Sequence, residues 1–300
     1  MNNHGSLVIS LDFEMMWGCI EWGTPQGYGQ TNIRSVKTVV HNLVKLFEKY
    51  NVHATFATVG LLLNANKQES MTYLPQVTPS YTDTKLNPYP LIQKIDSKDE
   101  ALFFAPDLVA FLLTQKHIEL GSHTYSHYYC WADGQTLQQF EADLESMNQR
   151  CRASGCPAIH SIVFPKNQIN HSYLTLCKKY GIKVYRGNAQ SFFAKPKHKI
   201  QLITQKLLRF LDSYYNISGY SSYKIEEINL NEDPINIKAS RFLRPFNPKF
   251  VFLEKYKLKR IKREILHAAK HNEIYHLWWH PHNFGANMTK NLHQCEEILQ

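Results

Sequence analysis

The chain contains 300 residues, of which 43% are hydrophobic, and it carries a formal net charge of +9. This length accommodates one α/β barrel, which typically needs about 250 residues. No segment approaches the roughly 18 consecutive apolar residues that a membrane-spanning helix requires. The six cysteines include no CxxC pair, which favours reduced thiols over a disulfide framework.

Short β-rich segments alternate with amphipathic helices along most of the chain. Strands are predicted at residues 7–11, 53–59, 117–120, 160–164, 182–185 and 274–278, and helices near 36–47, 107–115, 136–152, 171–180, 199–215, 254–271 and 289–300. The stretch 64–106 is expected to be an inserted loop, and residues 218–250 are expected to be irregular. Because strands that alternate with helices form parallel sheets, the sequence predicts one α/β domain over residues 1–300, with insertions near 64–106 and 190–250.

Two carboxylates end the first predicted strand, in the segment Ser10-Leu11-Asp12-Phe13-Glu14. Side chains alternate between the two faces of a strand, so Asp12 and Glu14 are expected to point to the same side. Unpaired carboxylates beside an apolar core are costly, and a metal ion or a role in proton transfer would account for them. A solvated strand end would account for them too, so this motif alone leaves both interpretations open.

Histidines follow two other predicted strands. His123 and His127 lie four residues apart after a strand and a glycine, and neutral imidazole is a common ligand of divalent metals. His280 follows the last predicted strand, where it could act as a general acid or pack as a structural histidine. Because active sites of α/β barrels lie at the carboxyl ends of the strands, we expect these side chains to meet at one edge of the sheet.

Together, these motifs resemble the polysaccharide deacetylase superfamily, which includes the carbohydrate esterases of family four. The segment SLDFE resembles the first motif of the family in a D-x-E form, HTYSH resembles H-[ST]-x-x-H, and LWWH resembles L-x-x-H. The resemblance implies a distorted (β/α) barrel of about seven parallel strands and one divalent metal ion, for which we expect zinc. It implies these roles: Asp12 as general base, Glu14, His123 and His127 as metal ligands, and His280 as general acid.

Two motifs of the family are altered in this chain. The third usually reads R-x-P-x-G, but residues 163–167 read VFPKN, so its arginine is absent. Lys166 or Arg186 could take over the role of this arginine, which orients the base, and Asn167 is a further candidate for orienting the substrate. The fourth motif has no clear match around residues 185–193. These departures indicate a divergent branch of the family.

The predicted function is removal of the acetyl group from an N-acetylated sugar, in the biosynthesis of a bacterial surface polysaccharide such as O-antigen or capsule. Residues 1–5 show no leader, so we expect a cytoplasmic protein that acts on a nucleotide- or lipid-linked sugar. Trp17, Trp278 and Trp279 are candidates for stacking on the sugar, although core packing explains each of them equally well. Hydrolysis of another C–N bond, as in a cyclic ureide, and sugar binding without catalysis are the alternatives.

Most of the positive charge lies between Arg241 and His271, where ten Lys or Arg accompany two Glu. One apolar stripe is expected to dock the helix of this segment on the barrel and to turn its cations outward: Leu258, Ile261, Ile265 and Ala268. The cations could form a solvated face, or they could attract a phosphate-bearing substrate or the surface of the inner membrane. Nucleic acid is not expected, because no recognised binding motif accompanies them.

Overall fold

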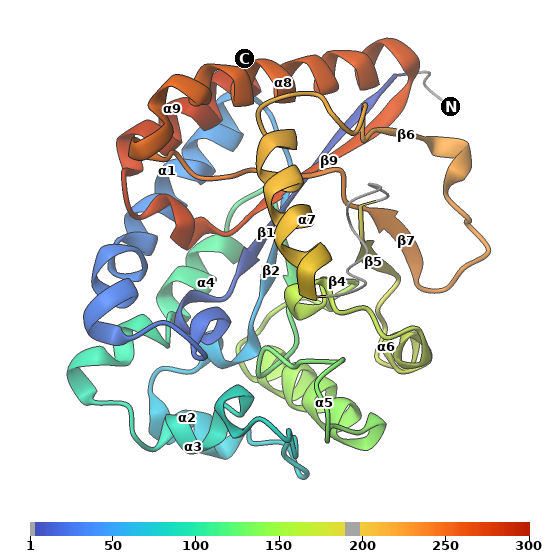
Figure 1. The fold of residues 1–300 in the computed structure, drawn as a ribbon. Coiled ribbons are helices and arrows are strands. Elements are labelled where there is room, and N and C mark those ends of the chain that lie inside the picture. The colour runs from blue at the N-terminus through green and yellow to red at the C-terminus, as the bar shows by residue number, and fades with distance from the viewer. Residues whose placement is uncertain (1–3, 190–198) are drawn as a thin grey trace.

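A curled, mostly parallel β-sheet is the centre of the computed structural model (Figure 1). Its strands are β1 (Ser6–Phe13), β2 (Ala54–Thr58), β3 (Ile118–Ser122), β4 (Ser161–Ile162), β5 (Val184–Gly187), β6 (Tyr223–Lys224), β7 (Ile235–Lys238), β8 (Arg241–Phe242) and β9 (Glu273–Trp279). Their order is β6-β9-β1-β2-β3-β4-β5-β7, with β8 also paired to β9. All pairings within the described chain are parallel except that of β6 with β9. The predicted α/β fold with a distorted barrel is therefore confirmed.

The structure describes residues 4–189 and 199–300. Residues 1–3, part of the N-terminal segment on which the expectation of a cytoplasmic protein rests, lie outside this range. Residues 190–198 also lie outside it. They include the beginning of the insertion expected near 190–250 and part of the stretch in which the fourth family motif would fall.

The chain between β7 and β8 connects the two ends of the curled sheet. β7 pairs with β5, whereas β8, only two residues later, pairs with β9. The backbone N–H of Ala239 donates to Gly187 (2.8 Å), and the next N–H, of Ser240, donates to His276 (2.9 Å). The expectation that residues 218–250 are irregular is therefore wrong in part. Strands of two to four residues are too short to show an alternating hydrophobic pattern.

Helices surround this sheet (Figure 1). The principal ones are α1 (Val36–Lys49), α4 (Pro106–Leu113), α5 (Leu137–Ala153), α6 (Leu174–Lys179), α7 (Lys199–Asp212), α8 (Val251–His271) and α9 (Met288–Leu299). In α1, Val39, Leu43 and Phe47 recur at helical spacing and are fully buried. The side chain of Thr136 begins α5 by accepting a hydrogen bond from the N–H of Gln139, which completes a capping box. The bounds of these principal helices match the helices predicted from periodicity.

Short helical segments make up the remaining helical structure of the described chain. They are η1 (Met15–Cys19), η2 (Pro25–Gly29), η3 (Ile33–Ser35), η4 (Gly60–Leu63), α2 (Lys67–Thr72), η5 (Thr84–Leu86), α3 (Tyr89–Ile92), η6 (Ser97–Leu102), η7 (Pro165–Asn167), η8 (His171–Tyr173), η9 (Ile225–Glu227), η10 (Pro248–Phe250) and η11 (Pro281–Phe284). Several of them lie in the stretch 64–106 that was expected to be a loop. Local capping explains this difference: the Asn66 side chain accepts from the N–H of Glu69, and the Asp83 side chain accepts from that of Lys85.

The basic helix α8 docks on the barrel as predicted, but part of its charge is buried. Leu258, Ile261 and Ala268 of the apolar stripe are buried. Lys257 and Arg260 are buried with them, contrary to the expectation that the cations of the helix turn outward. Lys257 pairs with Glu254 (2.6 Å), and Arg260 lies among acidic groups of α7 and α8. No helix within residues 4–189 and 199–300 is long and apolar enough to cross a membrane.

Candidate metal centre and active site

The carboxyl ends of β1, β3 and β9 bring the predicted site residues together. Asp12 is near the end of β1, Glu14 follows it, and both side chains are buried. β1 lies between β2 and β9 in the sheet, with Leu11 opposite Trp279, so His280 emerges beside the two carboxylates. His123 and His127 follow β3, which pairs with β2.

Glu14 lies between the two histidines. Its Oε2 is 3.2 Å from Nε2 of His123 and 3.0 Å from Nε2 of His127. One potential ligand atom from each of the three residues lies within 4.8 Å of the others, and all three side chains are buried. The structure thus places a possible Glu/His/His metal site where the sequence predicted one.

The protonation of His123 shows that these donors suit a cation. Its Nδ1 lies 2.8 Å from the carbonyl oxygen of Val163, which can only accept a hydrogen bond, so Nδ1 carries the proton. In a neutral ring, Nε2 then directs a lone pair at the carboxylate of Glu14, and two lone pairs repel each other unless a cation lies between them. Two imidazole nitrogens and one carboxylate oxygen also form a common zinc ligand set.

Burial and nearby charge favour the ligand forms of these groups. Burial lowers the pKa of His127, which keeps its imidazole neutral. For Glu14, burial alone would raise the pKa, but the surrounding histidines, His280, His127 and His123, hold it well below its usual value, so the carboxylate is ionised. His127 Nδ1 has no hydrogen-bond partner among the described residues, so its ring can present the Nε2 lone pair.

The loop that carries the two histidines has an unusual backbone, held by a buried carboxylate. Thr124 and His127 have positive φ angles of 62° and 59°, which are rare for residues other than glycine and are often found at functional sites. Asp143 of α5 accepts hydrogen bonds from the N–H groups of Tyr125 (2.7 Å) and Ser126 (3.1 Å) and from the Ser126 hydroxyl. No local motif marks Asp143, because only the fold brings α5 to this loop.

Gly18 provides the space that the Glu14 side chain occupies. A Cβ atom at Gly18 would lie 1.9 Å from Oε1 and 2.0 Å from the carboxyl carbon of Glu14. Any larger residue would therefore displace the carboxylate from its position between the histidines. No sequence motif marks Gly18 either. The i, i+4 spacing from Glu14 is the only local signal, and it is weak.

Arg186 and Asp12 form a buried ion pair next to the candidate metal site. The guanidinium of Arg186, on β5, donates to both carboxylate oxygens of Asp12, at 2.6 and 2.8 Å. It also donates to Oδ1 of Asn167 (2.9 Å) and lies over the ring of Trp278, 4.2 Å from its centroid. Burial would raise the pKa of Asp12, but the charge and hydrogen bonds of Arg186, together with the nearby His123 and His280, outweigh this effect, and the pKa is lowered.

His280 faces both carboxylates from the carboxyl end of the neighbouring strand β9. Its Nε2 is 3.7 Å from Oδ2 of Asp12 and 3.5 Å from Oε1 of Glu14. The side-chain NH₂ of Asn283 lies 3.2 Å from Nδ1 of His280, and the hydroxyl of Tyr28 donates to Oδ1 of the same amide (2.8 Å). An NH₂ group only donates, so Nδ1 accepts, and in the neutral ring the proton lies on Nε2, toward the carboxylates.

His282 is a further buried histidine of this centre. Its Nε2 is 3.9 Å from Oε1 of Glu14, and its ring contacts that of His280, with 5.1 Å between centroids. Burial, and then the charge of His280, lower its pKa to about 3. His282 is thus an uncharged neighbour of Glu14. Its place two residues after His280 was the only sign of this in the sequence.

Three predicted substrate-contacting residues lie away from the expected positions. Trp17 and Trp279 are fully buried, so stacking of these rings on a sugar is contradicted by the structure. Trp17 packs against Phe103, and its indole N–H donates to the carbonyl of that residue (2.6 Å). Lys166 pairs with Glu21 rather than with Asp12, and its ammonium lies over the ring of Tyr129.

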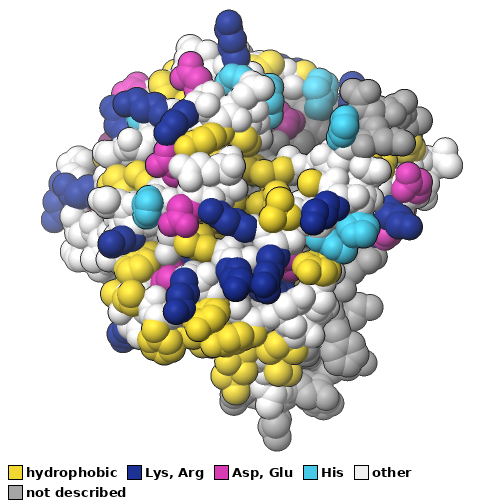
Figure 2. Space-filling view, turned by 90° about the horizontal axis from the view of Figure 1, so that it is seen from above, with side chains coloured by type: hydrophobic (Ala, Val, Ile, Leu, Met, Phe, Trp, Pro, Cys, Tyr) yellow, Lys and Arg dark blue, Asp and Glu magenta, His cyan; other side chains and the backbone are white. Residues whose placement is uncertain are grey.

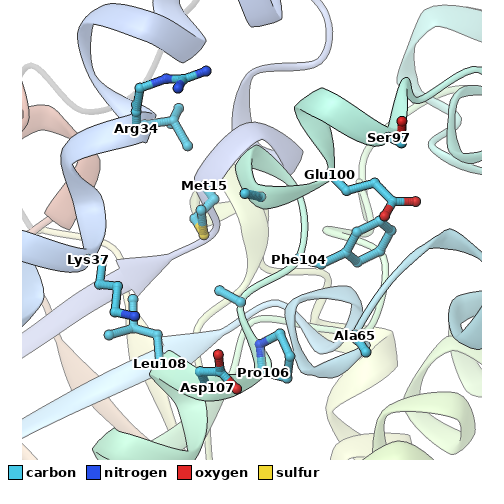
Figure 3. A pocket seen from close by; sticks show the side chains of 13 residues that line it. Met15, Arg34, Lys37, Ala65, Ser97, Glu100, Phe104, Pro106, Asp107 and Leu108 are labelled. Atoms are coloured by element: carbon cyan, nitrogen blue, oxygen red, sulfur yellow. The ribbon is translucent and has the colours of Figure 1, made fainter.

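A cavity of about 440 Å³ lies beside the centre, between the start of α1 and the start of α4 (Figure 3). Arg34 and Lys37 extend along one side of it, and Glu100 and Asp107 lie on the other sides. Of the residues around Glu14, only Met15 lines the cavity, and none of the clustered carboxylates or histidines does. We therefore assign this cavity no part in the chemistry of the centre.

A family model described as polysaccharide deacetylase matches residues 26–185, which is more than half of the chain. The chain belongs to the polysaccharide deacetylase family. The match includes His123, His127 and the altered third motif, whereas Asp12, Glu14 and His280 lie outside it. The curated proteins give no match.

Solved structures resemble this deacetylase-family chain in fold. A Mycobacterium smegmatis protein assigned as a polysaccharide deacetylase aligns with a TM-score of 0.58 and 10% identity, over 100% of this chain and 86% of the other. A 4-alpha-glucanotransferase from Thermococcus litoralis aligns with a TM-score of 0.53 and 10% identity, over 99% of this chain and 37% of the other. At these identities the likeness concerns the fold alone.

The buried carboxyl of Asp143 generates a prediction about stability and pH. Burial raises its pKa from 3.8 to about 6. Between these values the folded protein binds more protons than the unfolded chain, so this group makes the protein less stable as the pH rises from about 4 to about 6. The effect is on the order of 3 kcal/mol. Asp143→Asn lacks this titration, so its deficit in Tm relative to the wild type should shrink across that range in calorimetry.

Glu145→Gln, on the same helix and at a partly exposed position, is the matched control. Its difference in Tm from the wild type should change less over the same range. A deficit for Asp143→Asn that stays constant from pH 4 to pH 6 would contradict the assignment of a buried, titrating carboxyl.

Proposed function

We propose that this protein is a metal-dependent deacetylase that hydrolyses the acetamide of an N-acetylated sugar. The observation that carries the proposal is the cluster of Glu14, His123 and His127 beside the Asp12–Arg186 ion pair. Membership of the polysaccharide deacetylase family supports an acetylated carbohydrate as substrate. The cluster and the ion pair lie at the same edge of the sheet, where barrels of this type carry out their chemistry.

Glu14, His123 and His127 would hold one divalent ion, and Asp12 would act as the general base. When bound, such an ion makes water more acidic and polarises a carbonyl group. Asp12 is ionised, because Arg186 lowers its pKa, so it can accept the proton of the attacking water. Arg186 also fixes the plane of this carboxylate through two hydrogen bonds. We propose that it takes the orienting role of the arginine missing from the third motif, with Asn167 supporting it.

His280 is the proposed general acid. The amide of Asn283 directs the Nε2 proton of this ring toward the centre, where the leaving nitrogen of the sugar would lie. Protonation of that nitrogen completes the hydrolysis to acetate and a free amine. Asn283 and Tyr28 act through His280 and are positioning residues.

Exposed aromatic residues near the centre could contact the sugar in place of Trp17 and Trp279. Trp22 is exposed, and its ring packs against that of Tyr28 (4.8 Å between centroids), which bonds to Asn283. We propose Trp22 as a stacking surface. Zinc as the ion, the nucleotide or lipid carrier, the role in surface polysaccharide biosynthesis and the cytoplasmic location stay predictions from the sequence.

Replacement of Gly18 tests the role of Glu14 without removing a ligand. In Gly18→Ala, the new methyl group forces the Glu14 carboxylate to move, at little cost to the fold because the end of a side chain gives way. We expect zinc affinity to fall by about 10–100-fold, as it does when groups that position a ligand are altered, with a nearly unchanged Tm. Calorimetric titration with zinc measures the first quantity.

Gly23→Ala is the matched control, because the three atoms nearest its methyl group would all belong to Cys19, at 3.0–3.3 Å, and none to Glu14. Wild-type zinc affinity in Gly18→Ala would show that Glu14 is not held as a ligand in this position.

Asp12→Asn should separate catalysis from metal binding. Its amide cannot accept a proton, so acetate release from N-acetylated sugars should fall by about 10²–10⁴-fold, while elemental analysis still finds about one metal ion per chain. His123→Ala should lose the metal as well as activity, and Asp107→Asn, at an exposed position, should retain both.

If the Asp12→Asn protein contains no metal, Asp12 is itself a metal ligand. Metal-loaded wild-type protein that releases no acetate from a broad panel of such sugars would overturn the proposed function.

A further inference from the structure

The outward face of α8 exposes large apolar side chains. Phe252 is 66% exposed, Leu266 58% and Val251 56%, and Tyr256 is also exposed. The face continues onto the chain after α7, where Tyr215 is exposed and its ring contacts that of Tyr256 (5.6 Å between centroids). Isolated exposed apolar residues are common, but several large ones on the outward face of one helix favour an interaction surface.

The same face is positively charged and contains no acidic residue. Lys255, Lys259, Arg263 and Lys270 are exposed, and within the described chain no salt bridge joins them to an acidic group. Both glutamates of α8 point inward instead. Glu254 pairs with Lys257, and Glu264 receives two hydrogen bonds from Arg241, at 2.6 and 2.7 Å. Figure 2 views the molecule from the side on which α8 lies and shows Lys and Arg side chains beside exposed hydrophobic ones.

We propose that this α8 face binds the surface of an anionic lipid bilayer. An amphipathic helix that combines exposed apolar groups with cations is suited to lie in the headgroup region of a bilayer. There the apolar groups insert between the lipids, and the cations contact the lipid phosphates. A second copy of the chain would place cations against cations. A nucleic acid would attract the cations but would leave Val251, Phe252 and Leu266 in water.

The position of α8 would bring the candidate active site near the bilayer. β8 runs parallel to β9 and leads into α8, so the helix begins at the edge of the sheet where β9 ends in His280. Val251 and Phe252 are in the first turn of α8, at this end. The docking itself does not depend on the proposed deacetylase chemistry, and its test needs no substrate.

Vesicle co-sedimentation of the full-length protein tests the proposal. Binding is expected with vesicles of phosphatidylcholine mixed with phosphatidylglycerol, but not with phosphatidylcholine alone, and it should weaken as salt rises because exposed charges are screened. Lys255→Gln/Lys259→Gln/Arg263→Gln should reduce affinity for the mixed vesicles at least about tenfold, since each cation near such a surface contributes appreciably. Phe252→Ser should reduce it several-fold, while calorimetry shows an unchanged Tm.

The matched controls change three exposed cations and one exposed apolar residue elsewhere on the surface. They are Lys45→Gln/Lys85→Gln/Lys94→Gln for the charge and Leu230→Ser for the exposed apolar group. Absence of binding to mixed vesicles at low salt would overturn the proposal, and so would an equal loss in the control variants. A third outcome is that the protein binds soluble heparin tightly but does not bind vesicles, and that Phe252→Ser leaves heparin binding unchanged. This outcome would assign the face to a soluble anion instead of a bilayer.

Discussion

Two buried imidazoles share the carboxylate of Glu14, and this contact determines how the rest of the centre is built. Because the Val163 carbonyl holds the proton of His123 on Nδ1, the other nitrogen of the neutral ring directs a lone pair at an ionised carboxylate. Such an arrangement calls for a cation. The space left by Gly18 and the backbone held by Asp143 keep Glu14 and the histidine loop in this arrangement.

A second charged pair lies beside this cluster and stays distinct from it. Asp12 has its own counter-charge in Arg186, so it does not need the cation that Glu14 requires. Two neighbouring carboxylates can then have different roles, since their surroundings differ. Buried carboxylates also have their own counter-charges at α8. Glu254 pairs with Lys257 and Glu264 with Arg241, so the exposed charges on the outer face of the helix are cations.

Local patterns predicted six of the nine strands of the described chain, most helices and the residues at the strand ends, because alternation and motif spacing depend on neighbours in sequence. The Arg186–Asp12 pair spans 174 positions, so sequence analysis could offer Arg186 only as one of two candidates. The sequence pattern also did not show which tryptophans are exposed. Trp17 and Trp22 lie in one short segment, yet packing against Phe103 buries the first, while the second reaches the surface. Asp143 and Gly18 matter through contacts that only the folded chain creates.

The central claim is that Glu14, His123 and His127 bind one divalent ion while Asp12 remains free of it. Anomalous diffraction from crystals of the full-length protein grown with zinc tests this claim most directly. The account predicts one strong peak, about 2.0–2.2 Å from Nε2 of each histidine and from a Glu14 oxygen, with Asp12 still paired to Arg186. A peak at Asp12 with Glu14 turned away, or no peak at an intact cluster, would contradict it.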